Sequence, residues 1–412
     1  MNIVLTGATG LLGRNLLFEF IKQYINDLDS LSIILLGRKE ASTTLQERIN
    51  KIVLEDGFSY IGDRYNDNIQ EFARARIHCI EIDLNGEDLH ISTADIYKLK
   101  ARSIDFFFHI ASVTDFRDSE SVKNLLWESN IKGTERILSL VKQLDVQEFC
   151  YVSSAYCCGQ TSGEIMPDYI NLNQEFRNPY ELSKLKAEII TRDFAKEHGI
   201  RYRCFRPSTI SGRLIEHPLG TIDKFDVFYG WGAFWLHSKL RKIENIDRAY
   251  TDRITLNARI YAARNSGLNI VPADYAAKVM YEVCAQRDCG ESYHIVNNEE
   301  TQHDFYLAEI CRSLNIEGIE FVDIMPTDLN QIESFYYKTV GRIFAGYLSS
   351  QPMLFSTTNL ESVLAKSNLA CPKIDRTNFG ILMNFAINNN FGINLSKFTR
   401  TQKMEQRERQ KV

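Results

Sequence analysis

Tyr180 and Lys184 have the residue types and the spacing of a proton-exchanging pair. They are four residues apart in a segment whose apolar residues recur at helical spacing, so they lie on one helix face. A tyrosine hydroxyl has an unperturbed pKa of about 10, and a lysine ammonium one turn away lowers that pKa. We therefore predict that Tyr180 acts as an acid and base with Lys184 beside it.

Two serines upstream could stabilise negative charge in the same reaction. Ser153 and Ser154 follow the predicted strand 148–152, which is apolar after Glu148. Addition of hydride to a carbonyl creates an oxyanion, which needs hydrogen-bond donors that are already in place. Tyr180 would supply one donor, and a serine at the end of this run would supply another. These residue types together predict hydride transfer at a carbonyl carbon.

Three glycines near the first residue indicate where the hydride donor would bind. They follow the apolar run 3–5 directly and open a segment of helical spacing. The free N–H groups and the dipole at the start of a helix attract a pyrophosphate when the backbone can approach it closely. We therefore predict a dinucleotide-binding loop. The residues expected in it are Gly7, Thr9, Gly10, Leu11, Leu12 and Gly13.

The residue after the second apolar run selects between the two nicotinamide dinucleotides. Folds that prefer NAD usually have an acidic residue there, which binds the ribose 2′-hydroxyl. This chain has Arg38, followed by Lys39. A guanidinium can form bidentate hydrogen bonds to a 2′-phosphate and stack on adenine. We therefore predict NADP(H) as the cofactor; the alternative is that Arg38 is an ordinary charged loop residue.

All of these residues stand at the ends of elements that alternate regularly along the chain. Short, almost continuously apolar runs are typical of strands buried on both faces of a parallel sheet, and helix-length segments separate them. This alternation predicts an α/β fold with a doubly wound parallel sheet. The expected strands are residues 3–5, 33–36, 78–82, 105–110, 148–152, 203–205 and 292–296, and the clearest helices are 11–25, 122–141 and 180–194.

The pattern changes after residue 211, which predicts a second, smaller domain. Aromatic residues concentrate in 225–235, and most of the later chain has helical spacing. We expect a Rossmann domain that binds NADP and a mostly helical domain that binds the substrate, followed by a polar, flexible tail. The predicted bounds are 1–211 with a return at about 266–299 for the first domain, 212–265 and 300–398 for the second, and 399–412 for the tail.

Composition excludes several other classes of protein. The net charge of −5 provides no basic field, so we expect no nucleic-acid partner. No apolar run has the length of a membrane span, and nothing resembling a targeting segment precedes the first strand. The nine cysteines are scattered and the histidines lack ligand spacing. We therefore expect reduced thiols, no metal and a cytoplasmic location.

The glycine spacing G-x-x-G-x-x-G and the Tyr-x-x-x-Lys pair resemble those of extended short-chain dehydrogenases/reductases. The resemblance implies that Ser154, five residues before Gly159, is the active hydroxyl, and that Ser153 supports the cofactor loop. It also implies cofactor contacts at the ends of other strands; taken by itself, Asp83 is more typical of a helix cap or a turn former. The contacts implied are Asp83, Leu84, Ala111, Ser112, Ser153, Tyr180, Lys184, Pro207 and Ser208.

Four stretches resemble a narrower group: fatty acyl-CoA reductases and the carrier-protein thioester reductases of male-sterility type. They are 109–116, 151–156, 271–275 and 293–297. The resemblance implies NADPH-dependent reduction of an acyl thioester, carried by coenzyme A or by an acyl or peptidyl carrier protein, to an aldehyde and then an alcohol. Residues 225–235 would line an acyl pocket or simply pack a core. The resemblance also implies a homodimer.

Three other functions are alternatives for a chain with this fold. A nucleotide-sugar epimerase, dehydrogenase or dehydratase has the same tyrosine and lysine with bound NAD. Ala155 after Ser154 disfavours dehydration, because dehydratases tend to have an acidic residue there, and Arg38 disfavours NAD. A non-catalytic NADP-binding regulator would not require Ser154, Tyr180 and Lys184 together. A hydroxysteroid-type dehydrogenase stays open.

Overall fold

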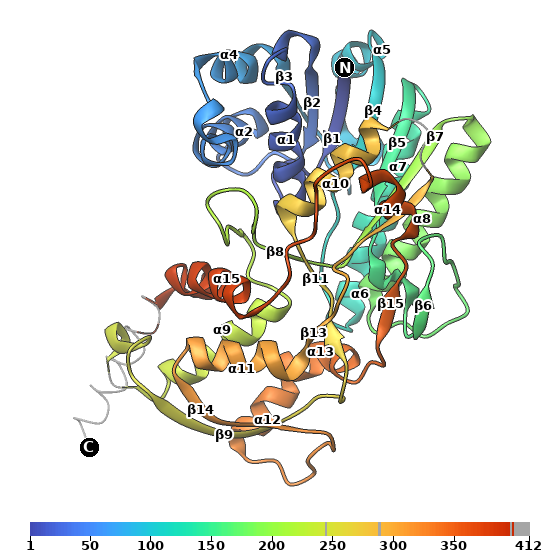
Figure 1. Ribbon diagram of the computed structural model, residues 1–412. Coiled ribbons are helices and arrows are strands. Elements are labelled where there is room, and N and C mark those ends of the chain that lie inside the picture. Colours follow the sequence, from blue (N-terminus) through green and yellow to red (C-terminus); the bar gives the residue numbers. More distant parts are fainter. Residues whose placement is uncertain (244, 287–289, 396–397, 399–412) are drawn as a thin grey trace. The chain divides into compact units, whose positions relative to one another are not determined.

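The computed structural model describes residues 1–243, 245–286, 290–395 and 398, and the predicted tail 399–412 lies outside them. The chain forms two compact units, each built from three segments (Figure 1). The first consists of Met1–Pro218, Ile270–Asn298 and Met353–Pro372, and the second of Leu219–Asn269, Glu299–Pro352 and Lys373–Val412.

A seven-stranded sheet forms the centre of the first unit, in the order β12-β7-β5-β4-β1-β2-β3. Every neighbouring pair is parallel. The predicted doubly wound α/β fold is thus confirmed, with a reversal of strand order between β1 and β4. The strands are β1 (Asn2–Thr6), β2 (Ser32–Gly37), β3 (Ile77–Glu81), β4 (Ser103–His109), β5 (Asp145–Val152), β7 (Arg201–Pro207) and β12 (Ser292–Ile295).

Helices cover both faces of this sheet, which explains why its strands are apolar throughout. On one face, side chains of α1, α10 and α14 pack with alternate strand residues such as Ile3 and Leu5. On the other, α5, α7 and α8 pack with Val4 and Phe107. The helices are α1 (Leu11–Gln23), α5 (Thr93–Lys100), α7 (Gly133–Val141), α8 (Pro179–His198), α10 (Ala273–Ala285) and α14 (Thr358–Leu364).

Two features of the first unit differ from the simple alternation of strands and helices. Three helices lie between β2 and β3: α2 (Leu45–Ile52), α3 (Phe58–Ile61) and α4 (Asp67–Arg76). The expected helix 122–141 contains a π-helical segment, Trp127–Lys132, between α6 (Glu120–Leu126) and α7. Two short parallel pairs complete the unit: β6 (Gly163–Ile165) with β15 (Met353–Phe355), and β8 (Thr209–Ser211) with β11 (Ile270–Pro272).

The second unit is mostly helical and has an aromatic core. Trp231 and Trp235 on α9 are buried, and Trp231 Nε1 donates a 3.0 Å hydrogen bond to the Tyr336 hydroxyl. No described helix is both long and apolar enough to cross a membrane. The elements are α9 (Phe228–Leu240), β9 (Ile254–Tyr261), β10 (Gly267–Leu268), β13 (Thr301–Gln302), α11 (His303–Ser313), β14 (Ile316–Val322), α12 (Gln331–Lys338), α13 (Val340–Leu348) and α15 (Arg376–Asn388).

Candidate active site

The predicted site residues lie at the carboxyl edge of the sheet in the first unit. Ligands of open α/β sheets bind at this edge, where the strand order reverses. The glycine loop follows β1, Ala111 and Ser112 follow β4, Ser153 and Ser154 follow β5, and Ser208 follows β7. Because β7, β5, β4 and β1 are consecutive neighbours in the sheet, all four strand ends are adjacent.

The glycine loop allows no side chain at two of its three glycines. Gly7 has a φ of +79°, and a Cβ there would lie 2.8 Å from the backbone nitrogen of Ala111. A Cβ on Gly13 would lie 2.1 Å from the Gly7 carbonyl oxygen. At Gly10, by contrast, the nearest atom would be that oxygen at 3.5 Å, an ordinary contact. The close approach of neighbouring backbone therefore requires glycine at positions 7 and 13, but it does not require glycine at position 10.

The start of α1 suits a phosphate group. Gly10 is the N-cap residue, is exposed and makes no side-chain cap, and no acidic residue lies in the first turn. The orphan N–H groups of the first turn and the helix dipole therefore remain available to an anion. The loop, its close backbone approach and the uncapped helix fit the pyrophosphate of a nicotinamide dinucleotide.

A buried hydrogen-bond network ties the end of β1 to the end of β4. The Thr6 hydroxyl oxygen accepts from the backbone N–H groups of Ile110 (3.1 Å) and Ala111 (3.2 Å). The His109 ring lies between Thr6 Oγ1 (2.9 Å from Nδ1) and Thr134 Oγ1 (3.1 Å from Nε2). Burial lowers the pKa of His109 to about 3, so the ring is neutral. The network orients the backbone on which the predicted contact Ala111 lies.

The local sequence explains why α8 begins just before Tyr180. Asn178 is the N-cap, and its side-chain oxygen accepts a 3.0 Å hydrogen bond from the Glu181 N–H. Pro179 occupies the first helical position, where its missing N–H costs nothing. The Tyr180 ring meets the Phe116 ring edge to face, with centroids 5.4 Å apart. The first turn is thereby held in place with Tyr180 on it.

Lys184, one turn after Tyr180, is buried with an exposed fraction of 2%. Its ammonium group donates to the Val152 carbonyl oxygen, at the end of β5, and lies 4.7 Å from the centroid of the Tyr151 ring. Burial lowers the pKa of Lys184 to about 8. The structure therefore brings this cation to the strand end that carries Ser153 and Ser154.

Ser154 caps a short 3-10 turn, Ala155–Cys158, and its hydroxyl oxygen accepts a 3.2 Å hydrogen bond from the Tyr156 N–H. Because that bond uses a lone pair, the hydroxyl proton can still be donated. Ser153 is buried, and its N–H donates to the Phe205 carbonyl oxygen at 2.8 Å. The turn closes at Gly159, whose φ is +61°. Both serines thus directly follow the carboxyl end of β5.

Asn130, which the sequence analysis did not select, joins the loop after β4 to α8. Its side chain accepts from the Val113 N–H (2.7 Å) and donates to the Val113 carbonyl (3.0 Å) and to Ser183 Oγ (3.0 Å). The Ser183 hydroxyl in turn donates to the Tyr180 carbonyl oxygen at 2.8 Å. Asn130 lies in the π-helical segment and is buried. An amide side chain on the apolar face of the predicted helix 122–141 was the signal in the sequence that could have identified it.

A buried ion pair supports the other side of α8. Arg206 on β7 is fully buried, and its guanidinium donates to both carboxylate oxygens of Glu188, at 2.6 and 3.1 Å. Glu188 lies one helical turn after Lys184. The pair connects the helix that carries Tyr180 and Lys184 to the strand that ends at Pro207. The next residue, Ser208, donates its backbone N–H to the Ile295 carbonyl oxygen at 3.0 Å.

The remaining predicted contacts follow β2 and β3. Arg38 is exposed directly after β2, and its carbonyl oxygen accepts a 3.1 Å hydrogen bond from the Arg48 guanidinium. Asp83, exposed after β3, accepts from the Asn85 N–H at 2.9 Å, which is the turn-forming alternative noted above. The Leu84 carbonyl accepts from Arg136 at 2.8 Å. Arg38 thus lies at the same sheet edge as the glycine loop.

Away from this edge, Glu148, Cys150 and Cys284 have ligand atoms within 4.8 Å of one another. All three are buried, but the carboxylate already pairs with Arg203. Burial is the first cause that raises the pKa of Cys150 well above its usual range. A protonated thiol and an ion-paired carboxylate are poor metal ligands.

The sequence profile of the family described as "Male sterility protein", an NAD-binding family, matches residues 5–280. Fatty acyl-CoA reductase 1 of Mus musculus is 31% identical over 301 residues, which are 65% of this chain and 55% of that protein. The chain thus spans about half the length of the curated relatives it matches. UDP-glucose 4-epimerase of Mycoplasma genitalium is 31% identical over 123 residues, 29% of this chain and 35% of that protein.

Among solved structures, the terminal R domain from the myxalamid PKS-NRPS biosynthetic pathway superposes with a TM-score of 0.69. The sequences are 18% identical, and the superposition covers 95% of this chain and 91% of that one. At this identity the likeness concerns the fold, including the arrangement of a Rossmann-type sheet.

Proposed function

Since this chain belongs to the male sterility protein family of NAD-binding proteins, we propose that it reduces acyl thioesters with NADPH as the cofactor. The observation that carries the proposal is the meeting of three groups at one edge of the sheet. Lys184 bonds to the carbonyl of Val152, two residues before Ser154, and lies one turn from Tyr180 on the same helix. The match to fatty acyl-CoA reductase 1 supports a thioester as the substrate.

In this proposal the chain's own residues handle the charge and the protons. A bound reduced nicotinamide supplies the hydride. As negative charge develops on the thioester oxygen, the hydroxyls of Ser154 and Tyr180 donate hydrogen bonds to it. Tyr180 gives its proton to that oxygen. The Lys184 ammonium, held by Val152 and Tyr151, stabilises the tyrosinate that Tyr180 becomes and holds the ribose of the cofactor.

The product of the first reduction then loses its thiol. When the hemithioacetal releases the thiol as coenzyme A or as the pantetheine arm of a carrier protein, an aldehyde remains. A second molecule of reduced cofactor, which would replace the oxidised one, would supply the hydride that converts the aldehyde to the alcohol, with Ser154 and Tyr180 in the same roles. Both reductions develop negative charge on an oxygen, so Ser154 and Tyr180 serve each in the same way.

Arg38 supports NADPH over NADH in this proposal. Its position after β2 is the one from which a side chain reaches the adenosine ribose in dinucleotide folds. No acidic residue stands at positions 38 or 39. The glycine loop and the first turn of α1 would hold the pyrophosphate, and Asp83, Leu84, Ala111, Ser112, Pro207 and Ser208 would line the rest of the dinucleotide. The second unit would bind the substrate, and a homodimer is part of the proposal.

A nucleotide-sugar epimerase is the second candidate, favoured by the stretch similar to UDP-glucose 4-epimerase. The two functions differ in whether the cofactor is consumed. Purified protein is mixed with NADPH and, separately, with acyl-coenzyme A, acylated carrier protein, aldehydes and UDP-sugars, and the absorbance of the reduced cofactor is followed. Consumption with thioesters supports our proposal, whereas interconversion of sugars without net consumption contradicts it.

Variants at position 180 test the assigned acid. Tyr180→Phe removes the hydroxyl and keeps the ring that contacts Phe116, so turnover should fall by about 10²–10⁴-fold, as is typical for loss of a general acid. NADPH binding, measured by fluorescence titration, should change little. Turnover that persists in Tyr180→Phe at the wild-type rate would show that another group is the acid.

A further inference from the structure

Three buried polar side chains lie in one row across the central sheet, at the carboxyl ends of β5, β7 and β12. Arg206 on β7 pairs in register with His294 on β12. The Ser153 N–H bonds to the Phe205 carbonyl oxygen, which continues the register of β5 and β7 by one residue. Residues in one row of a parallel sheet point to the same face. For this row it is the face that α8 covers, because Cys204, two residues before Arg206, packs there.

Each side chain of this row has one polar atom without a hydrogen-bond partner among the described residues. The atoms are Arg206 Nη1, His294 Nε2 and Ser153 Oγ. The residues are 0%, 1% and 2% exposed, respectively, so bulk water does not reach them. Buried polar groups in native proteins are almost always hydrogen-bonded. Three such atoms in one row therefore point to a partner that they share.

The other contacts of Arg206 and Ser153 do not satisfy these atoms. Arg206 Nε and Nη2 donate to the Glu188 carboxylate, and Nη2 also donates to the Tyr169 carbonyl oxygen at 2.8 Å. Because the guanidinium is planar, these bonds fix the direction of Nη1. The Ser153 hydroxyl lies beside the Cys157 thiol, which is only a weak hydrogen-bonding group.

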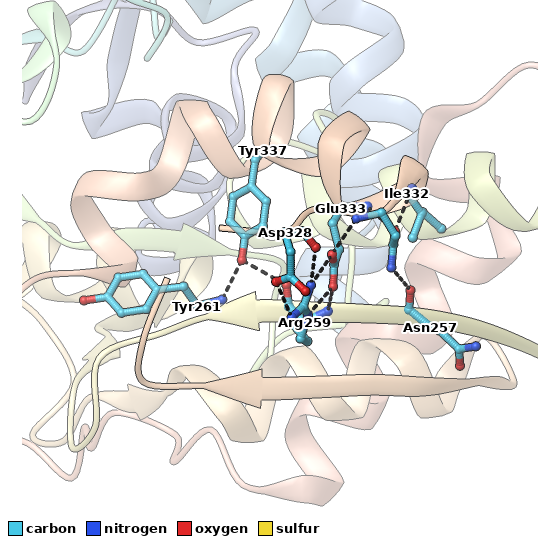
Figure 2. Close-up of polar contacts among 8 residues, drawn as sticks. Asn257, Arg259, Tyr261, Asp328, Ile332, Glu333 and Tyr337 are labelled. Carbon is cyan, nitrogen blue, oxygen red and sulfur yellow. Dashed lines mark hydrogen bonds and ion pairs between the residues drawn. The ribbon is translucent and has the colours of Figure 1, made fainter. Parts of the chain in front are cut away.

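Another arginine of the chain shows a guanidinium in which every nitrogen is bonded. Figure 2 shows Arg259, on β9 in the second unit, between Asp328 and Glu333. Its Nε and Nη2 donate to the Glu333 carboxylate at 2.8 and 2.9 Å, and its Nη1 donates to Asp328 Oδ1 at 2.9 Å. Arg259 is partly exposed, whereas Arg206 is fully buried and yet has one nitrogen fewer bonded. The need for a further partner is therefore greater at Arg206.

The bonding of His294 shows which kind of partner fits. Its Nδ1 lies 3.1 Å from the Ser356 carbonyl oxygen, which can only accept, so Nδ1 carries the proton. Burial lowers the pKa of His294 to about 3, and the charge of Arg206 adds to the effect, so the ring is neutral. His294 Nε2 is therefore an acceptor, whereas Arg206 Nη1 is a donor. The shared partner must both accept and donate hydrogen bonds.

A water molecule meets this requirement, and a simple anion does not. A halide ion could accept from Arg206 and Ser153, but it would face the lone pair of His294 Nε2. Neighbouring strands lie about 4.8 Å apart, and two hydrogen bonds of about 2.8 Å through one water span that separation. Buried waters typically make about three hydrogen bonds to polar groups that are otherwise unsatisfied. The row offers that number.

We propose that these three side chains hold one buried water molecule, and that this water positions the carboxyl end of β5. The water accepts from Arg206, donates to His294 and bonds to the Ser153 hydroxyl. Ser154 is the next residue, and the bonds from Arg206 to Glu188 continue the connection to α8. The water site does not depend on the proposed function; only its effect on turnover rests on that function.

A crystal structure that resolves ordered waters tests the site directly. We expect electron density for one water within about 3.2 Å of Arg206 Nη1, His294 Nε2 and Ser153 Oγ. Crystals grown in sodium bromide form a second arm, because anomalous scattering locates bromide. The absence of density in the row, a direct hydrogen bond between two of the three side chains, or bromide at this position overturns the proposal.

Variants at position 294 test the positioning role by turnover. His294→Leu removes the acceptor for the water, and kcat for thioester reduction should fall by about 10–100-fold, as expected when a catalytic group is misplaced. The KM for NADPH should change little, because β12 and β1 are not neighbours in the sheet. His294→Gln, whose amide can donate to Ser356 and accept from the water, should recover most of the loss. An unchanged kcat in His294→Leu, or no recovery in His294→Gln, overturns the positioning role.

Two more variants keep the test decisive. Ser153→Ala removes a single hydroxyl, and kcat should fall in this variant even if His294→Leu does not fold. Thr191→Val on α8 is the matched control, because its buried hydroxyl donates within the helix to the Ala187 carbonyl oxygen at 2.8 Å; an equal fall of kcat there contradicts the role of the water. If the wild type reduces no thioester, the proposed function fails, and crystals of Ser153→Ala and Thr191→Val decide instead: displacement of Ser154 in the first variant alone supports the positioning role, and an unmoved Ser154 overturns it.

Discussion

Alanine at Gly10 or at Gly13 should separate the role of the loop in cofactor binding from its role in folding. At Gly13 the new Cβ would lie 2.1 Å from the Gly7 carbonyl oxygen, about 1.3 Å short of an ordinary contact. The other close atoms are also backbone, so no side-chain rotation relieves the overlap. Overpacking costs about 1–3 kcal/mol, and alanine in a helix recovers about 1 kcal/mol.

We expect Gly13→Ala to lower the free energy of unfolding by about 2 kcal/mol, because the overlap with backbone lies at the costly end of that range. For a unit of this size the melting temperature should then fall by about 4–8 °C. At Gly10 the Cβ meets the same oxygen at 3.5 Å, and the backbone φ of −85° suits any residue. Gly10→Ala should therefore change the free energy of unfolding by about 1 kcal/mol or less.

Gly10→Ala should nevertheless weaken NADPH binding, because its methyl group lies where the pyrophosphate would approach the start of α1. Loss of one charge-assisted hydrogen bond costs about 1.5–3 kcal/mol, which corresponds to at least about a tenfold rise in Kd. Calorimetric melting and NADPH fluorescence titration are measured on the same preparations. Wild-type affinity in Gly10→Ala, or equal loss of stability in both variants, would refute the reasoning.

Two further predictions concern the cations of the site. Arg38→Ala should raise the KM for NADPH by about 10–100-fold, because the lost guanidinium–phosphate contact is charge-assisted. The KM for NADH should stay nearly unchanged. Lys39→Ala is the matched control, and a wild-type preference for NADH would contradict the assignment. Lys184 has a pKa lowered to about 8 by burial, so its charged form predominates below that pH and is lost above it. The kcat/KM should therefore fall as pH rises through about 8. In Lys184→Arg, whose guanidinium does not titrate in this range, the remaining kcat/KM should not fall at that pH. A fall of kcat/KM at the same pH in both proteins would show that another group titrates.

The elements of the nucleotide-binding unit could be predicted from the sequence because their signals are local. Strands buried on both faces are apolar throughout, and the strand at 3–5 precedes glycines at a fixed spacing. Tyr180 and Lys184 share a helix face by spacing alone. Parallel strands that alternate with helices leave few topologies, so the strand ends that carry these residues had to meet at one edge.

Other features of the site depend on contacts between residues that are far apart in the sequence, and these were set only by the tertiary structure. Lys184 bonds to Val152, 32 residues away, and Asn130 bonds to Ser183, 53 residues away. No periodic pattern in the sequence predicts either contact. The same holds for two glycines on α9, which are alike in sequence: Gly232 packs against Phe391, whereas Gly230 borders a hollow. Short-range spacing places residues on elements, but the space beside each residue depends on which distant elements pack there, and only the folded chain determines that.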